Sequence, residues 1–262
     1  MGVTRVRVAV ETRAPTGETV ACLVGADPAV LVDPAARVDR LDRAVTDRDV
    51  AHVAVTHHHP DHVGAVESYA RQCDATVWAR AGRVEAFAAA TGVEPDRTFV
   101  DGTTIPTGDG PVRVVDTPGH APEHVAYRSA GTLVCGDLAI ADGSVAVAAP
   151  EGDVRAYLTS LRRVHAMAPD RLVPAHGPDL RGEAVRETVR RLIAHRLARE
   201  RRVREAVAAG AGTVRAVREA AYEKDLSGVE ELADATVRAH LAKLAVEGRV
   251  EWDGQRAGLA RR

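Results

Sequence analysis

Short runs of valine, leucine and alanine alternate with polar turns over residues 1–180, and this pattern predicts β-strands with helices between them. The expected strands cover residues 3–10, 20–24, 29–32, 52–56, 75–79, 112–115, 125–128, 132–135 and 171–173. Helical periodicity is expected over residues 61–72, 82–90 and 153–167. The early strands follow one another closely, as antiparallel neighbours do. The mixture therefore favours an α+β sandwich over a doubly wound parallel sheet.

The pattern changes from residue 181 onward. Residues 181–204 hold nine arginines and three glutamates and predict a long helix that ends near Ala209, before Gly210 and Gly212. Two helices follow at 213–222 and 231–247, then a hairpin at 249–259. Three helices followed by a hairpin are typical of a winged helix. We therefore expect a sandwich domain at residues 1–182 and a basic linker helix with a winged-helix domain at 183–262.

Composition narrows the class of protein. The 262 residues are 45% hydrophobic, 27% charged and only 3% aromatic, so aliphatic side chains must form the core and few rings remain to stack on bases. The net charge of −2, the lack of a long apolar run and the valine-and-charge N-terminus favour a soluble protein without a membrane partner or signal peptide. The three cysteines, Cys22, Cys73 and Cys135, are expected to be buried thiols in the cytoplasm.

A dense group of metal-ligand side chains follows the strand expected at residues 52–56. The run THHHPDH at residues 56–62 lies between that strand and a predicted helix, so it occupies a strand-to-helix turn. His57 and His59 are two positions apart in the turn, and Asp61 and His62 open the helix. These four side chains can converge from two sides, which suits a pair of metal ions better than a single ion.

Later strand ends carry three more side chains of the same kind. A Pro-Gly turn presents His120, the sequence Cys-Gly precedes Asp137, and His176 lies within Pro-Ala-His-Gly-Pro. With the first group they make five histidines and two aspartates, the donor set that two zinc sites of four or five ligands need.

The ordered motifs HxHxDH, Gly-His, Gly-Asp and a final His resemble those of the metallo-β-lactamase superfamily, over roughly residues 1–180. This resemblance implies a four-layer αββα sandwich. It also implies ligands for each of two metal ions: His57, His59 and His120 for the first, Asp61, His62 and His176 for the second, and Asp137 for both. Asp33 lies where the family usually has an Asp-Thr-Gly turn, so the resemblance gives it a supporting role.

The second half of the chain is similar to the beta-lactamase-like protein 2 group, which adds a C-terminal winged helix to the hydrolase core. The segments that carry this similarity are 136–147, 152–161, 174–178, His195-Arg196 with Arg199-Glu200, and 240–244. Members of that group are associated with endoribonuclease activity on single-stranded RNA. The chain has Ala121 and Glu123-His124 where the family more often has Thr and Gly-Ser.

The ligands imply the chemistry. Two zinc ions ~3.5–4 Å apart lower the pKa of a bridging water towards ~7, and the resulting hydroxide attacks a carbonyl carbon or a phosphorus. Asp61 is the expected catalytic residue, because it binds the second ion and can accept a hydrogen bond from the nucleophile. Manganese or iron would suit the same donors.

Several functions share this donor set. We expect a phosphodiesterase that acts on single-stranded RNA; the alternative is a glyoxalase II-like hydrolase of small thioesters or lactones. A mononuclear iron dioxygenase and a DNA-binding regulator with a vestigial core are further alternatives. The balanced charges of the last domain argue against a duplex DNA partner, and the oligomeric state is open.

The arginine-rich helix allows two interpretations. Arg199 and Arg202 could contact phosphates, or the helix could be solvated and carry ion pairs of Glu187 with Arg191 and of Glu200 with Arg204.

Three further features lie outside the expected set of metal ligands. His58 is expected to point away from the ligands, and His124 to lie either in the pocket wall or as an ordinary strand residue. An apolar stripe in the last helix is expected to be core: Val237, Leu241 and Leu244.

Overall fold

The computed structural model describes residues 2–223 and 225–260. They form two compact units that interleave along the chain. The first comprises the chain up to Thr117 together with Glu123–Gly143 and Ala168–Val185, and the second comprises Pro118–Pro122, Ser144–Met167 and the chain from Arg186 onward. The domain boundary expected at residue 182 stays a prediction.

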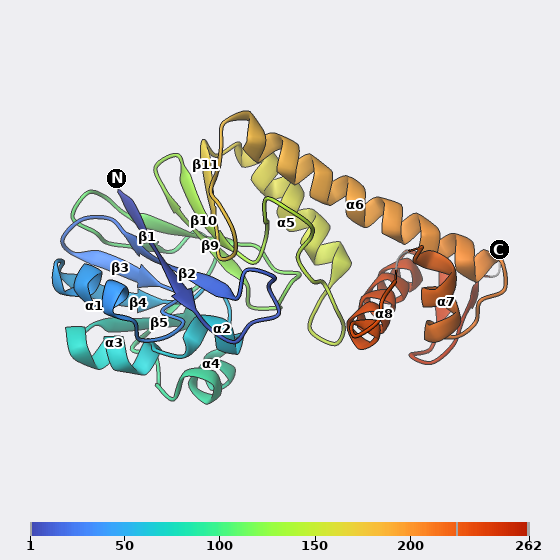
Figure 1. The fold of residues 1–262 in the computed structure, drawn as a ribbon, viewed down its shortest axis with the longest axis horizontal. Coiled ribbons are helices and arrows are strands. Elements are labelled where there is room, and N and C mark those ends of the chain that lie inside the picture. The colour runs from blue at the N-terminus through green and yellow to red at the C-terminus, as the bar shows by residue number, and fades with distance from the viewer. Residues whose placement is uncertain (1, 224, 261–262) are drawn as a thin grey trace. The chain divides into compact units, whose positions relative to one another are not determined.

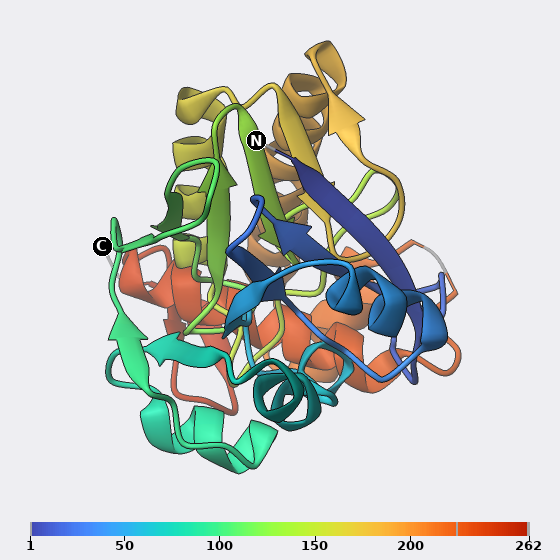
Figure 2. The same cartoon turned by 90° about the vertical axis from the view of Figure 1, so that its left-hand side faces the viewer.

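The first unit contains two six-stranded sheets, seen at the left of Figure 1 and facing the viewer in Figure 2. One sheet has the order β1-β2-β3-β4-β5-β6. Its strands are β1 (Val3–Ala9), β2 (Glu18–Val24), β3 (Ala29–Val32), β4 (Val50–Ala54), β5 (Thr76–Arg80) and β6 (Arg97–Phe99). The first three strands are antiparallel neighbours, and the pairs from β3 to β6 are parallel.

The other sheet has the order β12-β11-β10-β9-β8-β7. Its strands are β7 (Thr104–Ile105), β8 (Val112–Asp116), β9 (Val125–Ser129), β10 (Thr132–Gly136), β11 (Arg171–Pro174) and β12 (Leu180–Arg181). All neighbours are antiparallel except β10 and β11, which run parallel. The carboxyl ends of β10 and β11 therefore lie at the same edge.

Aliphatic side chains fill two layers of core in this unit. One cluster joins the two sheets through residues such as Val24, Val32, Val114 and Val134. The other packs helices against the outer face of the first sheet, with Leu41 among its members. The helices of the unit are α1 (Asp39–Thr46), α2 (Pro60–Val63), α3 (Val66–Cys73) and α4 (Val84–Thr91). This arrangement is the mixed α/β sandwich that the sequence predicted.

The prediction of one continuous helix over residues 61–72 is wrong, because the chain forms two helices there, α2 and α3. The break lies at Gly64, where an added Cβ would sit 2.5 Å from the Ala35 carbonyl oxygen, and Ala65 N–H donates to the Pro34 carbonyl at 2.9 Å. The backbone at the break thus pairs with the segment after β3, not with the preceding helical turn. The prediction also omitted α1 and the short strands β6, β7 and β12.

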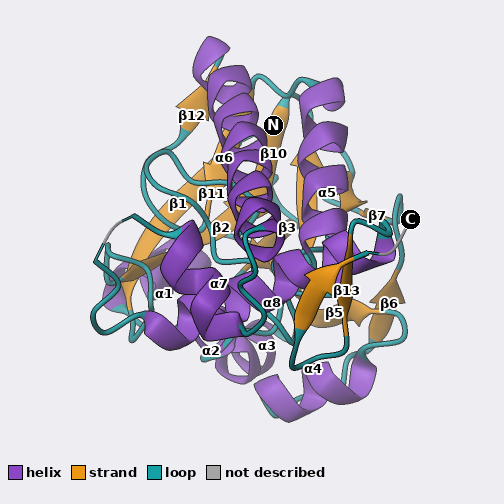
Figure 3. Ribbon diagram, turned by 90° about the vertical axis from the view of Figure 1, so that its right-hand side faces the viewer, coloured by secondary structure: helices purple, strands orange, loops and turns teal. Residues whose placement is uncertain are grey.

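The second unit is mainly helical, with α5 (Val154–Met167), most of α6 (Glu183–Ala208), α7 (Val214–Ala221) and α8 (Glu230–Val246). A hairpin of β13 (Val250–Trp252) and β14 (Ala257–Leu259) follows α8 (Figure 3). The predicted apolar stripe is core: Val237, Leu241 and Leu244 are all buried in one cluster. The helices and hairpin expected for a winged helix are present, in the expected order.

The expectations about buried cysteines and about membrane-spanning segments can be compared with the structure. Cys22 and Cys135 are buried, as expected, whereas Cys73 is only partly buried. Among the residues that the structure describes, no helix combines the length and the apolar character that crossing a bilayer requires.

Candidate metal centre

Four of the predicted ligands lie on the short segment that links β4 to α2. His57 and His59 follow β4, and Pro60 occupies the first helical position, where its fixed φ and missing N–H suit the start of a helix. Asp61 and His62 then lie on the first turn of α2. The local sequence therefore places two side chains in the turn and two on the helix, as predicted.

The second sheet brings two more ligands to this segment. Asp137 directly follows β10, and His176 follows β11 by two positions, so both lie at the edge where these parallel strands end. Backbone hydrogen bonds connect the sheets at this edge: Val20 N–H donates to the Ala175 carbonyl at 2.8 Å, and Val125 N–H donates to the Thr56 carbonyl at 2.9 Å.

The six side chains of the first unit converge. Ligand atoms of His57, His62 and Asp137 all lie within 4.8 Å of one another, and so do those of Asp61, His62 and His176. His176 Nε2 is 3.3 Å from Asp137 Oδ1 and 3.7 Å from Asp61 Oδ2. His59 Nδ1 lies 2.9 Å from His57 Nε2 and completes the set of six. The two overlapping trios share His62, so these side chains form one compact group of imidazole and carboxylate donors of the kind that metal ions bind.

The seventh predicted ligand, His120, belongs to the second unit. Its Nδ1 donates a hydrogen bond to the Ala146 carbonyl at 2.7 Å. The preceding Gly119 has φ +133°, and a Cβ there would lie 2.3 Å from the Tyr157 nitrogen, so the close approach of this loop to α5 requires glycine. Asp153 N–H at the start of α5 donates to the Gly119 carbonyl at 2.9 Å.

Three ligand rings in the first unit are held through the same nitrogen. His62 Nδ1 donates to Asp33 Oδ2 at 3.0 Å, and His176 Nδ1 donates to the Glu18 carbonyl at 2.8 Å. The Thr56 hydroxyl uses its hydrogen on Asp33, so at 3.1 Å it accepts from His57 Nδ1. Each ring therefore directs Nε2 into the cluster, the arrangement that orients metal-bound histidines.

Asp33 accepts several of the hydrogen bonds that hold the ligand segment in place. Its buried carboxylate accepts hydrogen bonds from the Thr56 N–H at 2.6 Å, from the Thr56 hydroxyl at 2.8 Å and from His62. Its backbone has φ 53°, in the left-handed region, which aspartate tolerates better than most residues. The supporting role that the resemblance implied for Asp33 is thus matched by its contacts.

The electrostatics of the cluster favour a cation. Burial lowers the pKa of His62, but Asp33, Asp137 and Asp61 outweigh burial and raise the pKa to about 9. Burial likewise lowers the pKa of His176, and its contact with Asp137 produces a net increase. Carboxylates thus dominate the field at the centre of the cluster.

One buried atom tests whether metal fits here. His62 Nε2 is buried and has no hydrogen-bond partner in the described structure, yet it lies 3.8 Å from Asp137 Oδ1 and 4.0 Å from Asp61 Oδ1. A cation between these atoms would satisfy all three. Imidazole and carboxylate donors suit zinc, manganese and iron, so the residues present fit a metal pair.

One further contact at the site has no counterpart in the sequence motifs. The Thr12 hydroxyl, in the loop between β1 and β2, donates to Asp61 Oδ2 at 2.5 Å. Thr12 is distant in sequence from every ligand and belongs to no recognisable motif, so only the folded chain reveals that it fixes the carboxylate expected to be catalytic.

The two undecided histidines take different places. His124 is buried; its Nε2 accepts from Asp137 N–H at 3.1 Å and its Nδ1 lies 2.8 Å from the Thr117 hydroxyl, so it supports a ligand directly. His58 points away, as expected. Its ring lies 5.5 Å from the ring of Phe87, and its backbone N–H donates to Glu123 Oε1 at 3.1 Å.

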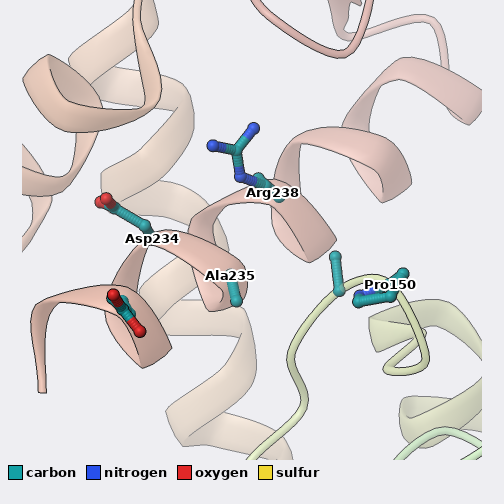
Figure 4. Close-up of a pocket in the computed structure, with 6 residues that line it drawn as sticks. Pro150, Asp234, Ala235 and Arg238 are labelled. Carbon is teal, nitrogen blue, oxygen red and sulfur yellow. The ribbon is translucent and has the colours of Figure 1, made fainter.

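A separate hollow of about 390 Å³ lies in the second unit and includes none of the predicted ligands (Figure 4). It is formed by the 149–150 loop and one side of α8, with Asp234 and Arg238 among its lining residues. It therefore offers charged side chains but no cluster of metal donors.

Two expectations for the arginine-rich helix are wrong, those for Arg199 and for the ion pair of Glu200 with Arg204. Arg199 is buried, with its guanidinium 3.6 Å above the ring of Tyr222, so this side chain is not presented to a phosphate in solution. Glu200 forms its ion pair with Lys243 of α8 at 2.6 Å, not with Arg204 as expected. Two contacts of α6 explain these differences: Tyr222, directly after α7, covers Arg199, and Lys243 of α8 pairs with Glu200.

Comparison with known proteins points to one superfamily. Residues 15–176 match the family model described as the Metallo-beta-lactamase superfamily. A hydroxyacylglutathione hydrolase of Rhodospirillum rubrum is 31% identical over 59% of this chain and 56% of its own length. A beta-lactamase-like protein 2 homolog of Caenorhabditis elegans is 26% identical over 61% of this chain and 52% of its own length. The chain thus spans about half the length of these curated relatives.

Solved structures extend the likeness to nearly the whole chain. A metallo-beta-lactamase family protein from Thermus thermophilus covers 98% of this chain and is itself covered to 98%, with a TM-score of 0.78 and 24% identity. A beta-lactamase domain protein from Burkholderia ambifaria covers 99% and is covered to 93%, with a TM-score of 0.81 and 24% identity. At this identity the likeness shows the fold alone.

Proposed function

Because the chain belongs to the metallo-beta-lactamase superfamily, we propose that it is a hydrolase whose metal pair is held by the seven side chains predicted from the sequence. The first ion would be held by His57, His59 and His120, the second by Asp61, His62 and His176, with Asp137 shared between them. The observation that carries this proposal is the convergence of Nε2 atoms and carboxylates around the Nε2 of His62, which has no hydrogen-bond partner among the described residues. Zinc is the metal we propose, with manganese or iron as alternatives.

A bound metal pair would lower the pKa of water from its value in bulk solvent towards ~7 and would stabilise negative charge that develops on the substrate. The chain's own contribution is to orient the reacting groups. Asp61 is held by Thr12, so one carboxylate oxygen keeps a fixed direction and can accept a hydrogen bond from the attacking water. Asp33 and the Glu18 carbonyl hold the rings of His62 and His176, which limits reorganisation during the reaction.

We propose a thioester of a hydroxy acid as the substrate class. The support is the similarity to hydroxyacylglutathione hydrolases, one of which is 31% identical over 157 residues. A carbonyl carbon suits attack by an activated water, and the thiolate is a good leaving group. A lactone would present the same electrophile.

Single-stranded RNA is the second candidate, and one observation favours it. Arg186, Arg190, Arg191 and Arg201 are exposed on α6, where Arg201 also lies 3.9 Å from the carboxylate of Glu205. Contacts from such side chains to phosphates weaken as salt rises. If RNA is the substrate, cleavage of a single-stranded oligonucleotide should fall steeply between low and moderate salt. Hydrolysis of a neutral thioester should depend on salt only weakly.

Two variants test the metal assignment. We expect Asp61→Ala and His62→Ala to bind one metal ion fewer per chain and to lose nearly all turnover. His58→Ala is the matched control, because His58 is adjacent in sequence but packs against Phe87, away from the cluster. Metal content after dialysis and turnover of a thioester and an oligonucleotide are the measurements. Full activity and unchanged metal content in either test variant would contradict the proposal.

A further inference from the structure

One short segment of the second unit is held from both sides by side chains that are far apart in sequence. The Ala146 carbonyl accepts a hydrogen bond from His120 Nδ1 at 2.7 Å. The neighbouring Val145 carbonyl accepts a hydrogen bond from a terminal nitrogen, Nη2, of Arg196 on α6. The adjacent carbonyls of Val145 and Ala146 therefore connect Arg196 to His120.

The contact with Ala146 determines the tautomer of His120. A carbonyl oxygen can only accept, so the hydrogen must be on Nδ1. The other nitrogen, Nε2, then presents its lone pair, and this is the form in which a histidine binds a metal ion. Moving the Ala146 carbonyl would remove this constraint and allow the ring to rotate or to change tautomer.

Burying the charged side chain of Arg196 costs free energy. Only 3% of the residue is exposed, burial lowers the pKa of its guanidinium, and its Nε has no hydrogen-bond partner in the described structure. Its guanidinium also lies 5.5 Å from the ring centre of Tyr157 on α5. An aliphatic side chain would fill the same space without the cost of desolvating a charge. An aliphatic residue could replace neither the contact with Tyr157 nor the hydrogen bond to Val145, and only the hydrogen bond reaches the segment that holds His120.

We propose that Arg196 is a positioning residue for His120, acting through the Val145–Ala146 segment. The inference rests on the proposed function, in which His120 is a ligand of the first metal ion. It assigns part of that site's geometry to the long helix α6, which the metal motifs do not include. Arg196 itself need not touch metal or substrate.

Arg199 provides a matched control. It lies on the same helix and is 8% exposed, and its guanidinium stacks on Tyr222 at 3.6 Å. Arg196→Met and Arg199→Met remove comparable buried charges from the same helix, but only the first removes the hydrogen bond to Val145. A general loss of packing would affect both variants, whereas a positioning effect is specific to Arg196.

The first measurement needs no metal. In long-range ¹H–¹⁵N NMR spectra of the metal-free protein, we expect His120 to show the Nδ1–H tautomer in the wild type and in Arg199→Met. In Arg196→Met we expect signals of mixed tautomers. Unchanged His120 signals in folded Arg196→Met would overturn the proposal.

The second measurement is metal affinity by competition with a chelator. We expect Arg196→Met to weaken one of the two binding phases about 10–100-fold, the usual effect of losing a group that orients a ligand, and to leave the other phase unchanged. Arg196→Lys, which keeps one donor, should weaken that phase less, and it replaces Arg196→Met if the latter does not fold. Wild-type affinities in both substitutions would refute the proposal.

His120→Ala separates this proposal from the proposed function. If His120→Ala loses one of the two metal-binding phases while the Arg196 variants keep both, the positioning role of Arg196 is wrong and the assignment of His120 as a ligand stands. If His120→Ala keeps both phases, the assignment of His120 as a ligand is itself wrong.

Discussion

His240 should make the second unit sensitive to mild acid. It lies in α8, fully buried, and neither ring nitrogen has a hydrogen-bond partner in the described structure. Burial lowers its pKa to about 3, together with the positive charges of Arg196 and Arg199 on α6 and of Lys243 on α8. The folded protein therefore keeps His240 neutral, whereas the unfolded chain protonates it below its ordinary pKa of 6.5.

The sign and size of the effect follow from this difference. The unfolded state binds the additional proton, so this titration leaves the stability unchanged above pH 6.5 and lowers the stability as the pH falls from 6.5 towards 3. Each unit between the two pKa values corresponds to about 1.4 kcal/mol, so lowering the pH from 7 to 5 should cost about 2 kcal/mol of unfolding free energy from this residue.

His240→Leu tests the argument with a side chain of similar size. At pH 7 the variant should be at least as stable as the wild type, because an unpaired buried polar group costs about 1–3 kcal/mol. At pH 5 its advantage should grow by about 2 kcal/mol. Urea unfolding of both proteins at pH 7, 6 and 5 gives the difference between them, in which the contributions of other groups cancel.

His195 is the comparison, because burial and the neighbouring arginines lower its pKa to about 4 while it stays only half buried. Between pH 7 and 5 His195→Asn should narrow the pH dependence by a similar amount, since a folded-state pKa of about 4 also lies below that range; the two variants should differ only near and below pH 4. Parallel stability curves for the wild type and His240→Leu between pH 7 and 5 would show that the buried ring is not the source of the effect.

Three further predictions concern the metal centre. Removing metal with a chelator should lower the melting temperature, and restoring it to about 100 times its Kd should return about 2.7 kcal/mol of stability, as calorimetry would show; an unchanged melting temperature would mean that metal does not bind the folded state. Asp33→Asn should weaken metal binding about 10–100-fold by loosening His62, measured by chelator competition, and an unchanged affinity would remove Asp33 from the support of the site. Gly136→Ala should unfold at lower urea, because its Cβ would lie 2.6 Å from Thr56 Oγ1 and 2.8 Å from His124 Nε2 at φ +49°; wild-type stability would show that these side chains can yield.

Much of the fold follows from local pattern. Valine-rich runs identified the long strands of both sheets, because a strand buried on both faces needs β-branched residues at successive positions. The prediction failed where length or tertiary contact decides. Strands β7 and β12 are two residues long and carry no periodicity. The split between α2 and α3 depends on the distant Pro34–Ala35 backbone, which no local pattern reveals.

The metal ligands could be predicted from the sequence, whereas the groups that hold them in place are harder to predict. Four of them lie within six consecutive positions and carry their chemistry in the side-chain type itself. Their supports come from elsewhere in the chain: Asp33 holds His62 across 29 positions, and the Glu18 carbonyl holds His176 across 158. A backbone carbonyl has no residue signature, so that contact could not be predicted from residue types.

These distant supports tie metal binding to the joining of the two sheets. His57 and His62 follow a strand of the first sheet, Asp137 and His176 follow strands of the second, and β2 of the first sheet supplies the carbonyl that orients His176. Separating the sheets would take apart both trios at once. Metal binding should therefore slow hydrogen exchange on both sides of the interface, in β4 and in β10, by similar factors. Protection confined to the β4–α2 turn would instead indicate that the HxHxDH segment binds metal by itself, without the second sheet.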